Sequence, residues 1–180
     1  MAVVSRLLVG SRLNGLNAKM KKILIAAAVV FSTSVFAGEA LVPKVYREIA
    51  VAPTNQREAE IASLFDRWNE ALATGDADSV ARLYAPDAVL EPTVSNEIRT
   101  TPASIKDYFV KFLKLKPHGT INLREIRLLS DDSALDTGVY TFDLMKNGKH
   151  QKVHARYTFV YKKVDGEWKI LNHHSSAMPE

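Results

Sequence analysis

Apolar residues recur at steps of three and four along residues 61–72, and this spacing predicts an amphipathic helix. Its apolar face would contain Ile61, Leu64, Phe65, Trp68 and Leu72. Asn55 stands three residues before Glu58, which is typical of a helix N-terminus, and Gly75 is a typical C-terminal stop. The pattern therefore predicts a long helix with one face buried.

Two further helices and a short strand are expected before residue 117. Asp76 can cap a short helix in which Leu83 and Tyr84 point inward and which ends at Pro86. A strand is expected over residues 87–91. Thr101 followed by Pro102 is typical of a helix start, because proline fits the first helical position.

After Pro117 the apolar period changes to two, which predicts strands. The four expected strands cover residues 120–129, 133–145, 151–164 and 167–174. Asn147-Gly148 and Asp165-Gly166 are typical two-residue hairpin turns. Helices followed by consecutive antiparallel strands predict an α+β domain, with three N-terminal helices packed on a mainly antiparallel sheet.

Charge is distributed unevenly along the 180 residues. The formal net charge is +4, yet residues 1–37 hold five basic residues and no acidic one. The rest of the chain therefore has 19 basic residues (24 less these five) and 20 acidic residues. We expect no nucleic-acid partner, because such binding needs clustered positive charge. The absence of cysteine excludes disulfides, thiolate metal sites and cysteine nucleophiles.

The basic N-terminal segment has the pattern of a secretory signal peptide. Lysines at 21 and 22 precede an apolar stretch over residues 23–31, and Val35-Phe36-Ala37 fits a cleavage site after Ala37. We expect a periplasmic or secreted protein with no membrane attachment after cleavage; an uncleaved anchor is the alternative. Residues 1–19 are expected to precede the true start at Met20.

The expected organisation has three parts. Residues 1–37 form the leader and signal peptide, residues 38–55 an N-terminal arm, and residues 56–180 the folded domain. A short edge strand is expected within the arm, over residues 45–51.

Several strings resemble the nuclear transport factor 2-like superfamily. They are residues 65–72, Gly75-Asp76, residues 83–88, and the strings Arg156–Tyr161 and His173–Pro179. The last two resemble the SnoaL-like group, which is related to the association domain of calcium/calmodulin-dependent kinase II. The resemblance implies a cone-shaped fold with a curved sheet around a long helix and a pocket at its wide end. It also implies a homo-oligomer, a dimer or ring formed through the outer face of the sheet.

Arg156 is the strongest candidate for a binding residue. It interrupts an apolar strand, where an unpaired guanidinium would be costly, so we expect it inside the cavity against an acidic partner. Its planar donors suit a small carboxylate or a peptide acid. The alternative is a structural ion pair, for example with Glu91. Strand alternation leaves open which face of the sheet is the inner one.

Glu91 is the candidate catalytic residue. In the ketosteroid-isomerase relatives of this superfamily the general base is a carboxylate just before a proline, and Glu91 precedes Pro92. A solvated carboxylate at the rim is the alternative. The match is incomplete, because Trp68 stands where those relatives carry a tyrosine. No cofactor is expected, since the dinucleotide-binding pattern Gly-x-Gly-x-x-Gly is missing.

His173 and His174 are adjacent in a predicted strand, so they would point to opposite faces, and no metal site is predicted. One of them is expected to donate a hydrogen bond to a ligand. Trp68, Tyr108 and Tyr140 are expected to form the wall of the pocket or the core beside it.

Three functions remain open at this point. The first is a secreted, self-associating, non-catalytic domain that binds a small acid. The second is a cofactor-free isomerase, dehydratase or cyclase with Glu91 or a pocket histidine as base. The third is an assembly module whose pocket is vestigial.

Overall fold

The computed structural model describes residues 46–178. The expected leader (1–37), residues 38–45 of the arm and residues 179–180 lie outside the described residues. The elements in chain order are α1 (Gln56–Ala73), α2 (Ala77–Ala81), β1 (Tyr84–Glu91), α3 (Pro102–Phe112), the 3₁₀ turn η3 (Leu113–Leu115), β2 (His118–Leu128), β3 (Ser133–Lys146), β4 (Lys149–Val164) and β5 (Glu167–Ala177).

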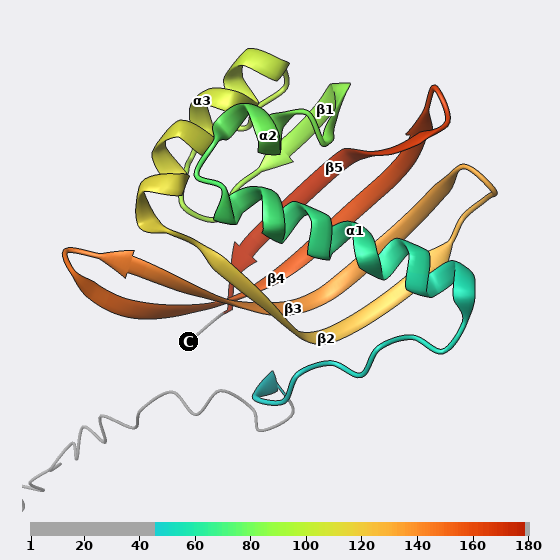
Figure 1. Cartoon of the computed structure of the whole chain (residues 1–180), viewed down its shortest axis with the longest axis horizontal. Coiled ribbons are helices and arrows are strands. Elements are labelled where there is room, and N and C mark those ends of the chain that lie inside the picture. The colour runs from blue at the N-terminus through green and yellow to red at the C-terminus, as the bar shows by residue number, and fades with distance from the viewer. Residues whose placement is uncertain (1–45, 179–180) are drawn as a thin grey trace, which may run out of the picture. The chain divides into compact units, whose positions relative to one another are not determined.

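The five strands form one sheet in the order β1-β5-β4-β3-β2. All neighbours are antiparallel except β1 and β5, which run parallel. The helices lie over one face of this sheet, with α1 running across it and α2 and α3 near β1 (Figure 1). The predicted α+β architecture, with three helices on a curved, mainly antiparallel sheet, is confirmed.

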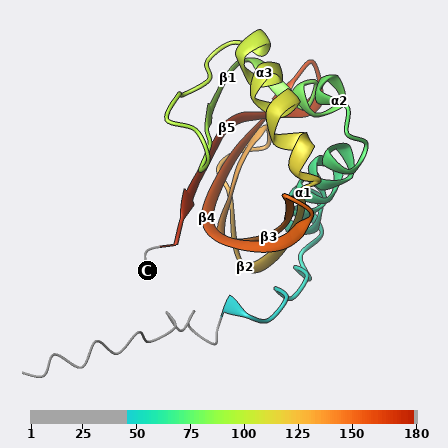
Figure 2. The same ribbon diagram turned by 90° about the vertical axis from the view of Figure 1, so that its left-hand side faces the viewer.

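The sheet curves around α1, as Figure 2 shows. One cause lies in β2, where the pairing register with β3 shifts between Ile121 and Leu123. The shifted backbone comes so close to Gly138 that a Cβ atom there would lie 1.9 Å from the carbonyl oxygen of Leu123. Only glycine accommodates this approach, because every other residue carries a Cβ atom.

Local signals for α1 and α3 act as the sequence predicts. The side chain of Asn55 accepts hydrogen bonds from the backbone N–H groups of Arg57 and Glu58, and Gly75 adopts a positive φ of 71°. Thr101 caps α3, with Pro102 in its first turn. The five apolar positions predicted for the inner face of α1 are all buried. Helix α1 therefore supplies the centre of the core.

The segment after α2 differs from the prediction. Helix α2 ends at Ala81, and β1 begins at Tyr84 and continues through Pro86. Proline is tolerated here because β1 is an edge strand that pairs only with β5, so the backbone N–H that proline lacks is not needed for pairing with a second strand. Tyr84 therefore belongs to the sheet and is 6% exposed.

The arm also differs from the prediction. Residues 46–51, the described part of the expected edge strand, form no strand. Two hydrogen bonds connect them to β2. The N–H of Ala50 donates to the carbonyl oxygen of Ile121 at 2.9 Å, and the side-chain amide of Asn122 donates to the carbonyl oxygen of Glu48 at 3.1 Å. None of the helices within residues 46–178 combines the length and apolar character needed to cross a bilayer.

Candidate functional site

A cavity lies between α3, α1 and the inner face of the sheet. Its volume, including the open mouth, is about 450 Å³. Val94, on the loop between β1 and α3, lies at the mouth and is 55% exposed. The lining consists of Trp68, Leu90, Pro92, Thr93, Val94, Tyr108, Phe109, Phe112, Tyr140, Phe142, Leu144, Val153, Ala155, His173 and Ser175.

Four of the predicted ligand-binding residues meet in this lining. Trp68 comes from α1, Tyr108 from α3, Tyr140 from β3 and His173 from β5. The structure thus brings together side chains that lie up to 105 positions apart in the sequence. Their contribution to binding stays a prediction.

The polar centre of the site is a hydrogen-bonded chain through Tyr84. Trp68 Nε1–H donates to the Tyr84 hydroxyl oxygen at 3.2 Å, and the same hydroxyl lies 2.9 Å from His173 Nδ1. The Tyr84 hydroxyl has one proton, and within the described residues His173 Nδ1 is the acceptor that it reaches. We therefore assign the proton of the Tyr84 hydroxyl to this bond, which makes Nδ1 an acceptor and leaves the imidazole proton on Nε2.

Burial keeps His173 neutral. The residue is 4% exposed, its ring stacks on Phe159 with 4.0 Å between centroids, and Trp68 meets it edge-on at 5.3 Å. Burial, with a smaller effect of nearby His174, lowers the pKa of His173 to about 3. At neutral pH the side chain is thus an uncharged imidazole, and its Nε2 is buried with no hydrogen-bond partner among the described residues.

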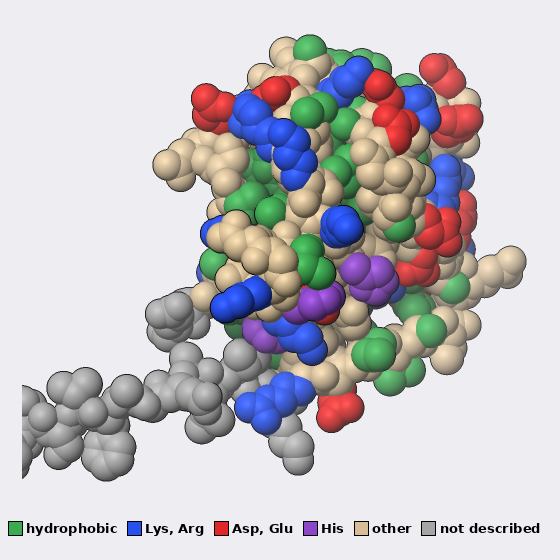
Figure 3. Space-filling view, turned by 60° about the vertical axis from the view of Figure 1, so that its left-hand side comes forward, with side chains coloured by type: hydrophobic (Ala, Val, Ile, Leu, Met, Phe, Trp, Pro, Cys, Tyr) green, Lys and Arg blue, Asp and Glu red, His purple; other side chains and the backbone are tan. Residues whose placement is uncertain are grey.

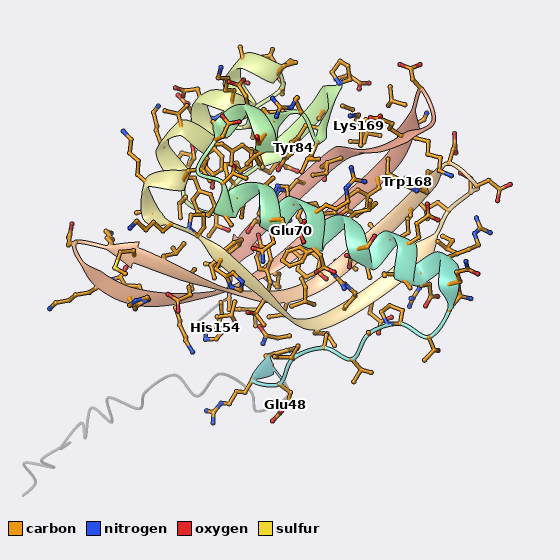
Figure 4. The ribbon with its side chains drawn as sticks, viewed as in Figure 1. Glu48, Glu70, Tyr84, His154, Trp168 and Lys169 are labelled. Carbon is orange, nitrogen blue, oxygen red and sulfur yellow. The ribbon has the colours of Figure 1, made fainter. Side chains whose placement is uncertain are left out.

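Figure 4 shows Tyr84 at the end of the molecule where α2, α3 and β1 lie. Tyr84 does not line the cavity, whereas His173 does. Because Tyr84 engages Nδ1, Nε2 is the ring nitrogen of this lining residue that is left without a partner. The arrangement offers one neutral N–H donor in a largely apolar space.

A second polar chain crosses the lining. Tyr140 Oη–H donates to Ser175 Oγ at 2.5 Å, and Ser175 Oγ lies 2.5 Å from Thr93 Oγ1. Burial raises the pKa of Tyr140 and of Tyr108 above the ordinary value, so both hydroxyls remain protonated at neutral pH. The chain connects β3 and β5 to the loop at the mouth, and each of its three hydroxyl groups has at least one hydrogen-bond partner.

The expectation that Arg156 lies inside the cavity is wrong. Alternation along β4 sends Ala155 and Tyr157 to the buried inner face and Arg156 to the outer one, where it is exposed. Its guanidinium is solvated and forms no ion pair with residues 46–178, including Glu91, so its position carries no burial cost. It lies beside an open groove formed by Thr137, Gly138, Arg156, Tyr157, Thr158, His174 and Ser176.

Glu91 also lies outside the cavity. In β1, Leu90 is the residue that points into the lining, so its neighbour Glu91 points to the other face. There Glu91 accepts a hydrogen bond from Asn172 Nδ2 at 3.2 Å and is paired in register with His174. The candidate base and the cavity are therefore on opposite sides of the sheet.

His173 and His174 do point to opposite faces, as predicted: His173 is buried and His174 is exposed. On the face shown in Figure 3, acidic and basic side chains are interspersed over the upper part, and histidine side chains gather with Lys and Arg lower down. No three metal-ligating side chains come together within the part of the chain that the structure describes.

Sequence reasoning missed a buried charged pair beneath α1. Arg124 Nε lies 3.2 Å from Asp136 Oδ2, and the Tyr157 hydroxyl donates to Asp136 Oδ1 at 2.9 Å. Asp136 is fully buried, and burial raises its pKa to about 6 even though Arg124 opposes the shift. Its place on the same strand face as Tyr140 was the signal that could have revealed it.

Comparison with known proteins gives the family. The sequence model of the calcium/calmodulin-dependent protein kinase II association domain matches residues 57–179. The chain belongs to this family. A crystal structure from Xanthomonas campestris, named as a candidate domain of the same kind, is similar to it: the sequences are 60% identical, the match covers 75% of this chain and 97% of that one, and the TM-score is 0.74.

More distant structures share the fold of this association domain. A nuclear transport factor 2-like superfamily protein from Salmonella enterica is 17% identical, with a TM-score of 0.59 over 67% of this chain and 90% of that one. A candidate scytalone dehydratase from Novosphingobium aromaticivorans is 17% identical, with a TM-score of 0.57 over 66% and 82%. The predicted relation to the association-domain family is confirmed by the family match, and the more distant structures, at identities this low, show a shared fold alone.

The lowered pKa of His173 predicts an acid-sensitive fold. The unfolded chain binds a proton at this histidine near pH 6.5, and the folded domain does so near pH 3. Protonation of His173 therefore favours the unfolded chain as the pH falls below 6.5. The free energy of unfolding should decrease by several kcal/mol in total between pH 6.5 and pH 3. Urea unfolding of wild type and His173→Gln between pH 7 and pH 4 measures it, and their difference in stability should shrink toward acid.

His174→Gln is the matched control, and we expect it to keep the wild-type acid sensitivity. Asp136 acts in the opposite sense, because its raised pKa makes folding more favourable as the pH falls from about 6 to 3.8. That contribution is common to all three proteins and cancels in the differences. A pH-independent difference between wild type and His173→Gln would contradict the assignment of a buried, neutral imidazole.

Proposed function

We propose that this association domain holds a small molecule in the cavity between α3 and the sheet, self-associates, and catalyses no reaction. The observation that carries the proposal is the cavity itself. Its walls are mostly aromatic and aliphatic, and one polar atom in them, His173 Nε2, is buried without a partner. Apolar walls with few polar groups are typical of small-molecule sites.

The alternative of a cofactor-free isomerase, dehydratase or cyclase receives less support. Glu91 lies on the other face of the sheet, and the described lining contains no carboxylate. A pocket histidine was the second candidate base, but a group whose pKa is about 3 is a weak base at neutral pH. His173 is better suited to donate a hydrogen bond than to remove a proton.

An acidic ligand in the cavity would lack its expected partner, because Arg156 lies outside. The described lining carries no Lys or Arg, and His173 is neutral. Placing a carboxylate there would remove its hydration without a compensating positive charge. The proposal therefore keeps the predicted small-molecule site and drops the predicted guanidinium anchor.

Self-association is proposed on two grounds. The matching family is named for association, and within residues 46–178 the helices cover one face of the sheet while the other carries no helix (Figure 2). Thr158 lies near the middle of that outer face, between Thr137 on β3 and His174 on β5. A dimer or ring formed through this face would leave the cavity on the opposite face accessible.

We also propose that the domain acts in the periplasm or outside the cell, because of the signal-peptide pattern ending at Ala37. Expressed in a Gram-negative host, the protein should appear in the periplasmic fraction with Gly38 as its first residue. Intact-mass measurement decides this. A full-length chain retained in the cytoplasm or membrane fraction would contradict the localisation without affecting the proposed site.

Filling the cavity should abolish binding. Ala155 is 1% exposed and lines the cavity, so Ala155→Leu places three additional carbon atoms in the space that a ligand would occupy. Toluene titrated into the wild-type protein should raise its melting temperature and should not do so for Ala155→Leu. Arg156→Ala, one position along and on the outer face, is the matched control and should behave like the wild type. Loss of binding in Arg156→Ala alone would contradict the location of the site.

Disrupting the outer face should dissociate the assembly. Thr158→Arg places a bulky, charged side chain at the proposed interface, where its desolvation would oppose association. Sedimentation velocity should give an oligomer for the wild type and a monomer for Thr158→Arg. Val110→Arg, on α3 at a position that is 46% exposed, should stay oligomeric. A monomeric wild type, or an oligomeric Thr158→Arg, would contradict association through this face.

A further inference from the structure

The unpartnered donor in the cavity indicates the chemistry of its ligand. The Tyr84 hydroxyl fixes His173 Nδ1 as an acceptor, so Nε2 carries the proton. That N–H is buried and has no acceptor among the described residues. Leaving a buried donor unpaired is unfavourable, so the site favours a guest that brings an acceptor.

The acceptor must be uncharged. The described lining contains no Asp, Glu, Lys or Arg, and the imidazole at its polar point is neutral. An anion that entered the cavity would lose its hydration and meet no positive charge. A cation would lose its hydration and meet no carboxylate. A carbonyl oxygen satisfies the donor and costs far less to desolvate than a charged group.

The walls indicate the rest of the molecule. Trp68, Phe109, Phe112 and Phe142 form a cluster of edge-to-face aromatic contacts within the lining. The space is limited, since its volume is about 450 Å³ even with the open mouth included. A flat ring is the shape that such walls contact most completely, and a compact molecule is the size that the space allows.

We propose that the cavity takes a compact, neutral ring compound with a carbonyl group, whose oxygen accepts a hydrogen bond from His173 Nε2–H. This inference rests on the proposed small-molecule function and specifies its ligand class. Tyr140, Ser175 and Thr93 are already hydrogen-bonded to one another, whereas His173 Nε2 is buried without a partner. The buried donor that recognises the carbonyl is thus held in a fixed tautomer by its neighbour Tyr84.

Three probes of nearly the same shape test the inference. Acetophenone carries the carbonyl, α-methylstyrene replaces its oxygen by a methylene group, and benzoate replaces the ketone by a carboxylate. Calorimetric titration of the full-length protein at pH 7 should give acetophenone an affinity about tenfold higher than α-methylstyrene, because one additional hydrogen bond forms to a donor otherwise unpaired. Benzoate should bind most weakly of the three.

Two variants locate the preference. His173→Phe removes the N–H and keeps a ring in place, so acetophenone and α-methylstyrene should bind this variant equally. His174→Phe makes the same change on the outer face and should retain the wild-type preference. If His173→Phe does not fold, infrared spectroscopy of the wild-type complex decides, because a hydrogen-bonded carbonyl stretches at lower frequency than a free one in an apolar medium.

The outcomes separate the two proposals. Equal binding of acetophenone and α-methylstyrene to the wild type would overturn the carbonyl inference and leave the small-molecule function in place. Tightest binding of benzoate, a preference that survives in His173→Phe, or an unshifted carbonyl stretch would also overturn it. If none of the three probes binds, both the inference and the proposed function fail.

Discussion

The Tyr84 hydroxyl, held between Trp68 Nε1–H and His173 Nδ1, is the interaction on which the site depends. It links α1, β1 and β5, which are elements from opposite ends of the domain sequence. By accepting from the indole it becomes the donor to the imidazole, and this sets the tautomer of His173. Burial then keeps that imidazole neutral, so a titratable side chain becomes a fixed, uncharged donor.

Strand alternation divides the chemistry of the domain between two faces. The inner face collects aromatic rings, the neutral imidazole and hydroxyl groups around a cavity, whereas Arg156, Glu91 and His174 point to the outer face. The inner face therefore suits a neutral molecule. The outer face carries solvated charges and, in the described part of the chain, no covering helix, so it suits contacts between protein chains. The adjacent histidines of β5 show this division: His173 lies on the buried inner face and His174 on the exposed outer face.

Much of the fold was predictable because its signals are local. Caps at Asn55 and Thr101, the helical spacing before Leu72 and the turn at Asn147-Gly148 each act within a few residues. The parallel pairing of β1 with β5 was not predicted, because it joins segments about eighty positions apart and leaves no local pattern. The end of α2 was predicted too late in the sequence for the same reason. Tyr84 belongs to a strand because of its pairing with β5, which a local pattern does not reveal.

The site was predicted in part for a related reason. Sequence alternation separated Tyr157 and Phe159 from Arg156, yet it did not say which set faces the helices. The bulk of that aromatic set was a usable signal, since it has far more apolar area to bury. His173 required one more fact, the pairing of its position with Phe159 across β4 and β5, which only the register of the sheet supplies.

Nitrogen-15 NMR of the histidine rings at pH 7 tests the central claim most directly. The account predicts that the His173 ring carries its proton on Nε2, with Nδ1 as an acceptor, and stays neutral well below pH 6.5. Replacing Tyr84 by phenylalanine should weaken this tautomer preference, because the hydroxyl proton that Nδ1 accepts is removed. A His173 ring that is protonated on Nδ1, or that titrates near pH 6.5, would contradict the account.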